Sequence, residues 1–157
     1  MVIQPIDPAN RAAVNAFIRR QWFTTQMAVH GQRFDLGIAD GWVAREGDAL
    51  IGLITYRVSG GEMEILSLDS LLENRGVGTA LLDMAVTSAR RDGLSRVVLF
   101  TTNDNLHALR FYQKRGFDMV MIHRDAVERA RSMKPEIPLT GLDGIPLKHE
   151  IELEMVL

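Results

Sequence analysis

The sequence predicts an α/β fold in which helices flank a mixed and mostly antiparallel β-sheet. Three observations support this class. A helical segment near the start is followed by short strand-like runs separated by glycine turns, which is typical of an antiparallel meander. The centre reads as strand, glycine loop, helix and buried strand, and this order predicts a central parallel βαβ unit. Near the end, apolar and acidic residues alternate as in a strand with one buried face.

The size and composition of the chain fit an ordinary globular enzyme. Its 157 residues are 46% apolar and 24% charged, so we expect a single domain over residues 1–157. The net charge of -2 gives no general attraction to nucleic acid or to acidic membranes, and we expect neither as a partner. Cysteine is absent from the sequence, which excludes disulfides and a thiolate nucleophile. The start lacks the apolar run of a signal peptide, from which we expect a cytoplasmic protein.

The first third should contain a strand, a helix and then the meander. Val2–Ile6 reads as a short strand, and Asp7 is expected to cap a helix whose first turn holds Pro8. The pattern allows a second helical piece toward His30. Apolar residues at helical spacing are Val14, Phe17, Ile18 and Trp22.

The meander should consist of three strands. Residues 42–45 and 50–58 are expected to pair around the turn Glu46-Gly47-Asp48. Gly60-Gly61 then turns the chain into a strand over 62–68.

The central helix and strands are marked by periodicity and by glycine. A helix is expected from Val77 to about Gly93, because small and apolar residues fall on one of its faces. The continuous apolar run within 96–101 predicts a strand covered on both faces. Residues 103–105 supply turn and cap chemistry for a helix over 106–115.

The last third should add two strands and a helix. Residues 117–123 read as a strand, and Asp125 with Glu128 forms a candidate capping pair for a helix over 126–133. The proline-rich stretch 134–146 is expected to be a loop. In the final strand, the expected buried residues are Ile151, Leu153 and Met155, and the expected exposed ones are Glu150, Glu152 and Glu154.

The glycine loop between strand 62–68 and the following helix is a candidate phosphate site. Arg75-Gly76-Val77-Gly78 lets the backbone approach a ligand, and the first helical N–H groups lack partners within the helix. A Walker loop is excluded, because no lysine follows the second glycine. A dinucleotide fingerprint is excluded because Leu81 stands where its third glycine is needed. A tight turn without a ligand is the alternative reading of these residues.

Two motifs in order resemble the GNAT superfamily of acetyl-CoA-dependent N-acyltransferases. They are RGVGTALL from Arg75 and the NxxAxxFYxKxGF pattern that starts at Asn105. The resemblance implies a GNAT-like fold and acetyl-CoA as co-substrate. The pyrophosphate loop of the family falls here on residues 73–78, with Glu73 where Gln or Arg is usual. Binding by backbone donors is then expected at Arg75, Gly76, Val77, Gly78 and Thr79.

The resemblance also implies how the rest of the cofactor is held. The family adds the pantetheine arm beside its fourth strand, which corresponds here to Leu66-Ser67-Leu68. Leu66 and Leu68 are therefore expected to contact the arm through their backbone groups. Asn105 matches an asparagine that often contacts the cofactor, and capping of the following helix is its other role.

The resemblance further suggests the catalytic groups. Tyr112 matches the tyrosine that protonates the departing thiolate, and packing against the sheet is the alternative. Glu62 lies where some members keep a glutamate base, although many members use no dedicated base. The histidines at 30, 107 and 123 lie in different elements and suggest neither a metal cluster nor a triad, so we expect no metal.

The sequence therefore predicts an acetyltransferase that uses acetyl-CoA on a primary amine of a small molecule or peptide. A non-catalytic CoA-binding sensor or assembly module on the same fold is the main alternative, and a nucleotide-phosphate binder is a weaker one. Acceptor selectivity is expected from the first helices and from residues 24–41. The insertion 126–146 is a candidate for covering the acceptor site or for a contact in a homodimer.

Overall fold

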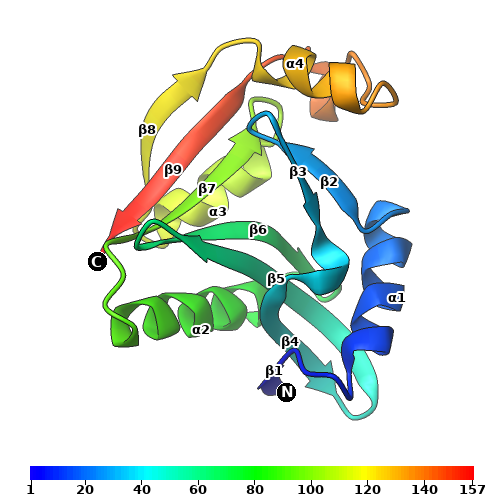
Figure 1. Ribbon diagram of the computed structural model, residues 1–157, viewed down its shortest axis with the longest axis vertical. Coiled ribbons are helices and arrows are strands. Elements are labelled where there is room, and N and C mark those ends of the chain that lie inside the picture. The colour runs from blue at the N-terminus through cyan, green and yellow to red at the C-terminus, as the bar shows by residue number, and fades with distance from the viewer. The chain divides into compact units, whose positions relative to one another are not determined.

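The computed structural model describes residues 1–157, apart from the side chain of Val29. The chain forms two compact units, of which the first comprises residues 1–27, 35–97 and 157, and the second residues 28–34 and 98–156. The expected α/β class is confirmed, with helices and a mostly antiparallel mixed sheet (Figure 1). In the part of the chain described, no helix is long and apolar enough to cross a membrane.

Four strands of the first unit form the expected antiparallel meander. Their order is β1 (Val2–Pro5), β4 (Asp40–Glu46), β5 (Ala49–Ser59) and β6 (Glu62–Ser70). Burial does not simply alternate along them: residues 51–55 of β5 are all buried, so both faces of that strand are covered there. The register between β5 and β6 shifts once: Thr55 pairs with Ser67 but Tyr56 pairs with Ile65. One extra residue, Leu66, therefore forms a β-bulge in β6.

The first helix begins later than the sequence predicts. Helix α1 spans Arg11–Trp22, so the expected start at Pro8 is wrong. The side chains of Asp7 and Asn10 each accept a hydrogen bond from the backbone N–H of the other, both at 2.8 Å, and this pair holds residues 7–10 in a turn. Asp7 therefore caps the turn that leads into the helix, in the reciprocal arrangement of a capping box, although the helix itself begins at Arg11. The helix buries Val14, Phe17 and Ile18 as expected.

The expected helical piece toward His30 is wrong, because a β-hairpin stands there. Helix α1 ends where Phe23 adopts a left-handed φ of 65°. Strands β2 (Gln26–Val29) and β3 (Gln32–Asp35) then pair around His30-Gly31. Both turn residues have positive φ, 50° and 73°, as a type I′ hairpin requires. The short 3₁₀ helix η1 (Leu36–Ile38) follows.

Helix α2 (Val77–Arg91) packs on β4, β5 and β6 within the first unit. Its start lies very close to β5 at Gly52. A Cβ added to Gly52 would lie 2.6 Å from Val77 Cγ1 and 3.0 Å from Leu81 Cδ1. Only glycine permits this approach, which fixes the position of the first helical turn.

The second unit contains the remaining strands and helices. β7 (Arg96–Thr102), which begins at the end of the first unit, lies beside β9 (Glu150–Val156), and β8 (Asp118–His123) follows at the edge. The helices are α3 (Leu106–Lys114) and α4 (Ala126–Met133), and the loop before β9 holds one short 3₁₀ turn, η2 (Leu142–Gly144). These elements match the sequence-based expectations to within one or two residues.

Two expectations for this unit are wrong. Asp125 makes no side-chain cap to α4, because its backbone is left-handed, with φ 57°. Its N–H instead donates to His149 Nδ1 at 2.9 Å. The alternation expected for β9 also fails: Glu150 is only 3% exposed, and Glu152, Glu154 and Met155 are all of intermediate exposure, so only Ile151 and Leu153 follow it.

Candidate functional site

The glycine loop presents an uncapped helix start to open space. Asn74 and Gly76 both have left-handed φ, 59° and 75°, and Gly76 occupies the N-cap of α2 without a side-chain cap bond. The first turn of α2 carries no acidic residue. A Cβ built on Gly76 would meet nothing within 4 Å, so an incoming group can reach the backbone there. This geometry fits phosphate oxygens, which favour the positive end of a helix.

Arg75, in the glycine loop, forms an ion pair with an acidic residue of β4. Its guanidinium lies 3.3 Å from the carboxylate of Glu46, at the end of β4. Both side chains are more than half exposed, so this pair contributes at most about 1 kcal/mol. Arg75 therefore stays available to an anionic ligand.

The strand residues expected beside the pantetheine arm lie at the bulge of β6. Leu66 is the extra residue, and Ser67 and Leu68 follow it. The Ser67 hydroxyl is buried and lies 2.6 Å from the Thr55 hydroxyl, which ties the strand to β5 on one side. A bulge leaves one residue out of the regular ladder and changes the strand direction. Backbone groups near Leu66 are thereby released from regular pairing with β5.

Asn105 and Tyr112 both lie on α3 or at its start. The Asn105 side chain accepts a hydrogen bond from the N–H of Ala108 at 3.1 Å, which confirms its capping role. Tyr112 is 8% exposed, and its ring packs edge-on against Phe111 and Phe117, with centroids 5.1 and 5.5 Å away. This packing fixes the ring, as both the catalytic and the structural reading require.

Glu62 and Glu64 project from one face of β6, as expected, while Met63 and Ile65 are buried on the other. Each carboxylate has a guanidinium partner at 3.0 Å, Arg96 for Glu62 and Arg57 for Glu64. One oxygen of Glu62, Oε1, is therefore engaged by Arg96.

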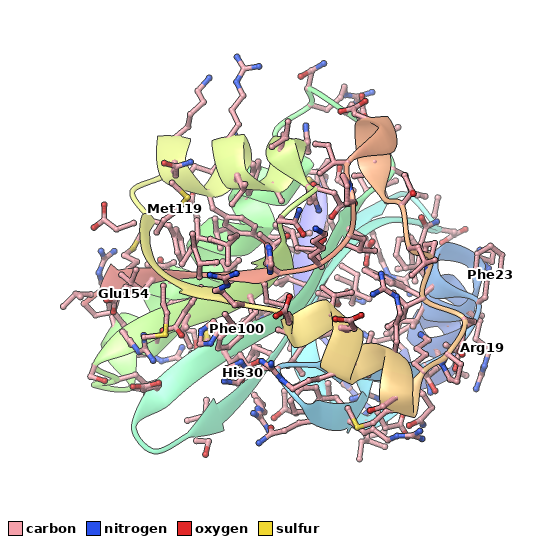
Figure 2. The ribbon with its side chains drawn as sticks, turned by 90° about the horizontal axis from the view of Figure 1, so that it is seen from above. Arg19, Phe23, His30, Phe100, Met119 and Glu154 are labelled. Atoms are coloured by element: carbon pink, nitrogen blue, oxygen red, sulfur yellow. The ribbon has the colours of Figure 1, made fainter. Side chains whose placement is uncertain are left out.

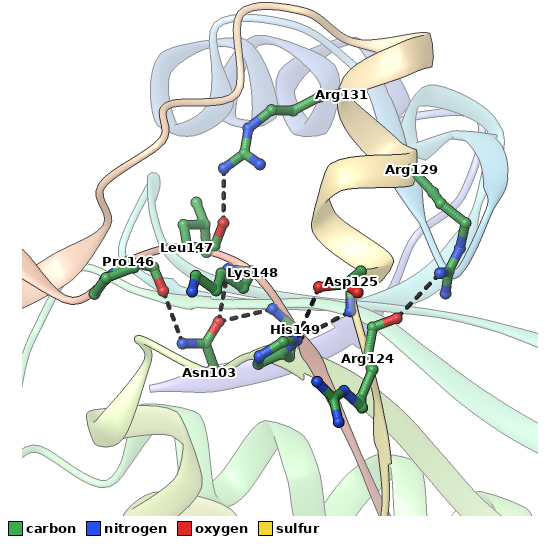
Figure 3. A network of polar contacts seen from close by, with 9 residues as sticks. All are labelled: Asn103, Arg124, Asp125, Arg129, Arg131, Pro146, Leu147, Lys148 and His149. Atoms are coloured by element: carbon green, nitrogen blue, oxygen red, sulfur yellow. Dashed lines mark hydrogen bonds and ion pairs between the residues drawn. The ribbon is translucent and has the colours of Figure 1, made fainter.

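The connection from β7 to α3 anchors the insertion before β9 (Figure 3). The Asn103 side chain accepts from the N–H groups of Lys148 and His149 and donates to the carbonyl of Pro146, all at 2.9 Å. Asp104 is 5% exposed and accepts from the N–H of Leu142 at 2.8 Å. Sequence reasoning treated residues 103–105 only as turn and cap residues. It missed this role because the partners lie about 40 positions away in the chain.

Sequence reasoning also missed a group of rings and carboxylates in the second unit. The His30 ring stacks on Phe100, with ring centroids 4.2 Å apart. Both residues are labelled in Figure 2. The His30 ring meets the His123 ring edge-on at 4.6 Å. The backbone N–H of His30 donates to both carboxylate oxygens of Glu150 at 3.1 Å, and His123 Nε2 lies 2.9 Å from Glu152 Oε1.

Burial raises the pKa of the Glu150 carboxyl above its usual value. The N–H of His30 and the nearby charges of His30, His123 and Arg129 partly oppose this rise. Among the described side chains, no three or more His, Cys, Asp or Glu residues are arranged to hold a metal ion. The alternating glutamates of the last strand were the one feature of the sequence that pointed to this group of side chains. His30 reaches them only because residues 26–35 fold as a hairpin.

A sequence profile described as the Acetyltransferase (GNAT) family matches residues 9–117 of this chain. The uncharacterized protein YdhI of Bacillus subtilis (strain 168) is 40% identical over 158 residues, which cover 100% of this chain and 99% of that protein. The solved IAA acetyltransferase from Bacillus cereus ATCC 14579 is 26% identical with a TM-score of 0.71, and 99% of each chain is covered.

A second solved structure supports the fold. It is a GNAT family acetyltransferase from Elizabethkingia anophelis with acetyl-CoA bound, and its TM-score is 0.71. Its sequence is 19% identical, and the match covers 99% of this chain and 97% of that one. The likeness extends over the whole chain, beyond the two motifs in the sequence.

Proposed function

We propose a function from the premise that this chain belongs to the acetyltransferase (GNAT) family. In this proposal, the protein moves an acetyl group from acetyl-CoA directly to a primary amine. The amine belongs to a small molecule or a peptide, and residues 1–157 act as one domain. The observation that carries the proposal is the uncapped start of α2 at Gly76, which is open to a ligand and has no acidic residue in its first turn.

The co-substrate would be held mainly by backbone groups. N–H groups from Arg75 to Thr79, with Val77 and Gly78 between them, would bind the pyrophosphate at the positive helix end. The bulged strand at Leu66 and Leu68 would pair with the amides of the pantetheine arm. Asn105 would add a contact from the start of α3, while its side-chain oxygen caps Ala108.

Two side chains are proposed for the chemistry. Tyr112 would give its phenolic proton to the departing thiolate, since a phenol with a pKa of about 10 remains protonated at neutral pH. Glu62 is the base that the resemblance suggests, and one of its two oxygens is engaged by Arg96 at 3.0 Å.

The test of this function compares Tyr112→Phe with Tyr56→Phe, which removes the other tyrosine hydroxyl of the chain. Tyr112→Phe should lower turnover by ~10²-fold, the lower end of the range for a positioned acid, because a thiolate is a fairly stable leaving group. The loss should shrink as the pH approaches the thiol pKa of about 8.5. Acetyl-CoA affinity should stay unchanged, and Tyr56→Phe should keep full turnover.

Calorimetry with acetyl-CoA, CoA and ATP distinguishes a CoA-binding protein from a nucleotide-phosphate binder. Binding of acetyl-CoA and CoA, but not of ATP, is expected. Turnover is then followed by thiol release with spermidine, tryptamine, glucosamine and an alanyl tripeptide as acceptors. Tight CoA binding with no thiol release above the acceptor-free rate would instead favour a CoA-binding sensor or assembly module.

A further inference from the structure

Five side chains of the second unit form what we call the histidine–glutamate cluster: His30, Phe100, His123, Glu150 and Glu152. They come from the β2–β3 turn, β7, β8 and β9. Glu150 and Glu152 are two positions apart and so project from the same face of β9. Glu150 is the cross-strand partner of His123, which brings that imidazole onto the same face.

His123 is held in one orientation by Glu152. Its Nε2 lies 2.9 Å from the Glu152 carboxylate, and less than a fifth of either side chain is exposed. An ionised carboxylate can only accept a hydrogen bond, so Nε2 must carry the proton. In the neutral ring the lone pair then resides on Nδ1, which can accept a proton from a ligand.

The cluster also concentrates negative charge where a cation would bind. Glu150 is 3% exposed, and the hydrogen bond from the His30 N–H engages both its oxygens. The charged or titratable groups around His123 are Glu152 and Glu150 from β9 and His30 from the hairpin turn. Arg129 of α4 acts on the same carboxylate, Glu150. Two carboxylates in this set attract an ammonium group.

The cluster is connected to the part of the chain that carries the proposed acid. Phe100, which stacks on His30, lies on β7 five positions before Asn105. The strand leads through residues 103 and 104 directly into α3, which holds Tyr112. The side chain of Asn103 binds the N–H of His149, next to Glu150. The end of β7 and the start of β9 are therefore fixed to each other.

We propose that the histidine–glutamate cluster receives the ammonium group of the acceptor, and that His123, oriented by Glu152, takes its proton. This inference rests on the proposed amine acetylation. His123 is then a catalytic residue, and Glu152 is a positioning residue that acts through it. The acceptor class is a primary amine that is protonated in neutral solution.

The proposed step balances. One N–H bond of the ammonium breaks and its proton moves to Nδ1 of His123, which leaves a lone pair on nitrogen. That pair forms a C–N bond to the acetyl carbon, and the C–S bond breaks with its electrons on sulfur. The thiolate takes a proton from Tyr112. The amide nitrogen loses its second proton, which passes through water to the Tyr112 phenolate, and His123 releases its proton to water when the products leave.

The experiment compares His123→Gln with His107→Gln, a matched change at an exposed histidine of α3. The probe is whichever of spermidine, tryptamine, glucosamine and the alanyl tripeptide the wild type acetylates fastest. His123→Gln should lower kcat by ~10²–10⁴-fold at neutral pH, and the loss should shrink toward the pKa of the amine, where it needs no base. Acetyl-CoA affinity should be unchanged. His107→Gln should behave as wild type.

A second pair of variants tests the orientation without changing the imidazole. Glu152→Gln should lower kcat with little change in KM for acetyl-CoA, and Glu152→Asp should restore part of the loss. Imidazole added to the assay should restore activity to His123→Ala, because the removed ring leaves space at the site. Glu62→Gln should retain more activity than His123→Gln.

Two failures can be told apart. If the wild type binds acetyl-CoA but acetylates none of the four amines, the proposed function is overturned and this inference with it. If the wild type is active, while a folded His123→Gln keeps its kcat across pH and imidazole has no effect on His123→Ala, only this inference is overturned. Thermal melts and acetyl-CoA binding establish folding. Should His123→Gln unfold, a full kcat in Glu152→Gln would overturn the inference instead.

Discussion

The close approach of α2 to β5 predicts that one methyl group at Gly52 disturbs both stability and ligand binding. In Gly52→Ala, the new Cβ would lie 2.6 Å from Val77 Cγ1, whereas ordinary contacts are 3.4–4 Å. The Asp69 carbonyl oxygen at 3.1 Å blocks retreat on another side. Val77 has few rotamers to escape into, because its side chain is β-branched. The first turn of α2 must therefore move by about 1 Å.

The magnitude follows from two opposing terms. Overpacking of this kind costs ~1–3 kcal/mol, and the stiff neighbours place Gly52 in the upper half of that range. Alanine in a strand recovers ~0.5–1 kcal/mol relative to glycine. The expected net loss is about 1–2.5 kcal/mol, which lowers the melting temperature by roughly 2–10 °C in a chain of this length. A displaced helix start should also weaken CoA binding about tenfold, the effect of one lost charged hydrogen bond.

The assay is a double-mutant cycle with Val77→Ala, measured by denaturant unfolding and by calorimetry with CoA. Val77 is 2% exposed, so Val77→Ala alone should cost ~1–3 kcal/mol. The double variant removes the clashing methyl and should be at least ~1 kcal/mol more stable than the sum of the single effects predicts. Additive effects, or a Gly52→Ala protein with wild-type stability and CoA affinity, would refute the reasoning.

The remaining predictions concern the loop and the buried carboxyl. Gly78→Val should abolish CoA binding measured by calorimetry without unfolding the protein, because the new side chain blocks the approach of the pyrophosphate to the backbone. Glu73→Gln should keep or improve CoA affinity, because it removes a negative charge near the phosphates. Burial raises the pKa of Glu150, so its stabilising contribution is complete below the ordinary value of 4.5 and falls as the pH rises through the folded pKa. The melting temperature of Glu150→Gln minus that of the wild type should therefore increase from pH 4.5 upward, and a difference independent of pH would contradict this.

The central part of the fold was predictable because its signals are local. The glycine loop, the apolar face of α2 and the cap at Asn105 each depend on residues within a few positions. The structure places α2 at Val77–Arg91 and α3 at Leu106–Lys114, one or two residues from expectation.

The errors arose where alternatives compete locally or partners lie far apart. Asp7 pairs with Asn10 as a cap, but residues 8–10 form a turn and the helix begins only at Arg11, a boundary that the local sequence leaves open. The hairpin at His30-Gly31 lacks the Asn-Gly or Asp-Gly signal of a type I′ turn, so its strands resembled a helical continuation. The burial of Glu150 could not be predicted, because its N–H donor, His30, is 120 positions away.

The partners of the glutamates decide where a proton can be transferred. Glu62 and Glu64 on β6 each face a guanidinium, and an arginine side chain keeps its proton throughout the physiological pH range. In such pairs the arginine cannot exchange a proton with a substrate, and one carboxylate oxygen is already engaged. Glu152 on β9 faces an imidazole, whose second ring nitrogen can accept a proton. For that reason the face of β9, more than the face of β6 that the sequence favoured, has the chemistry to deprotonate an amine.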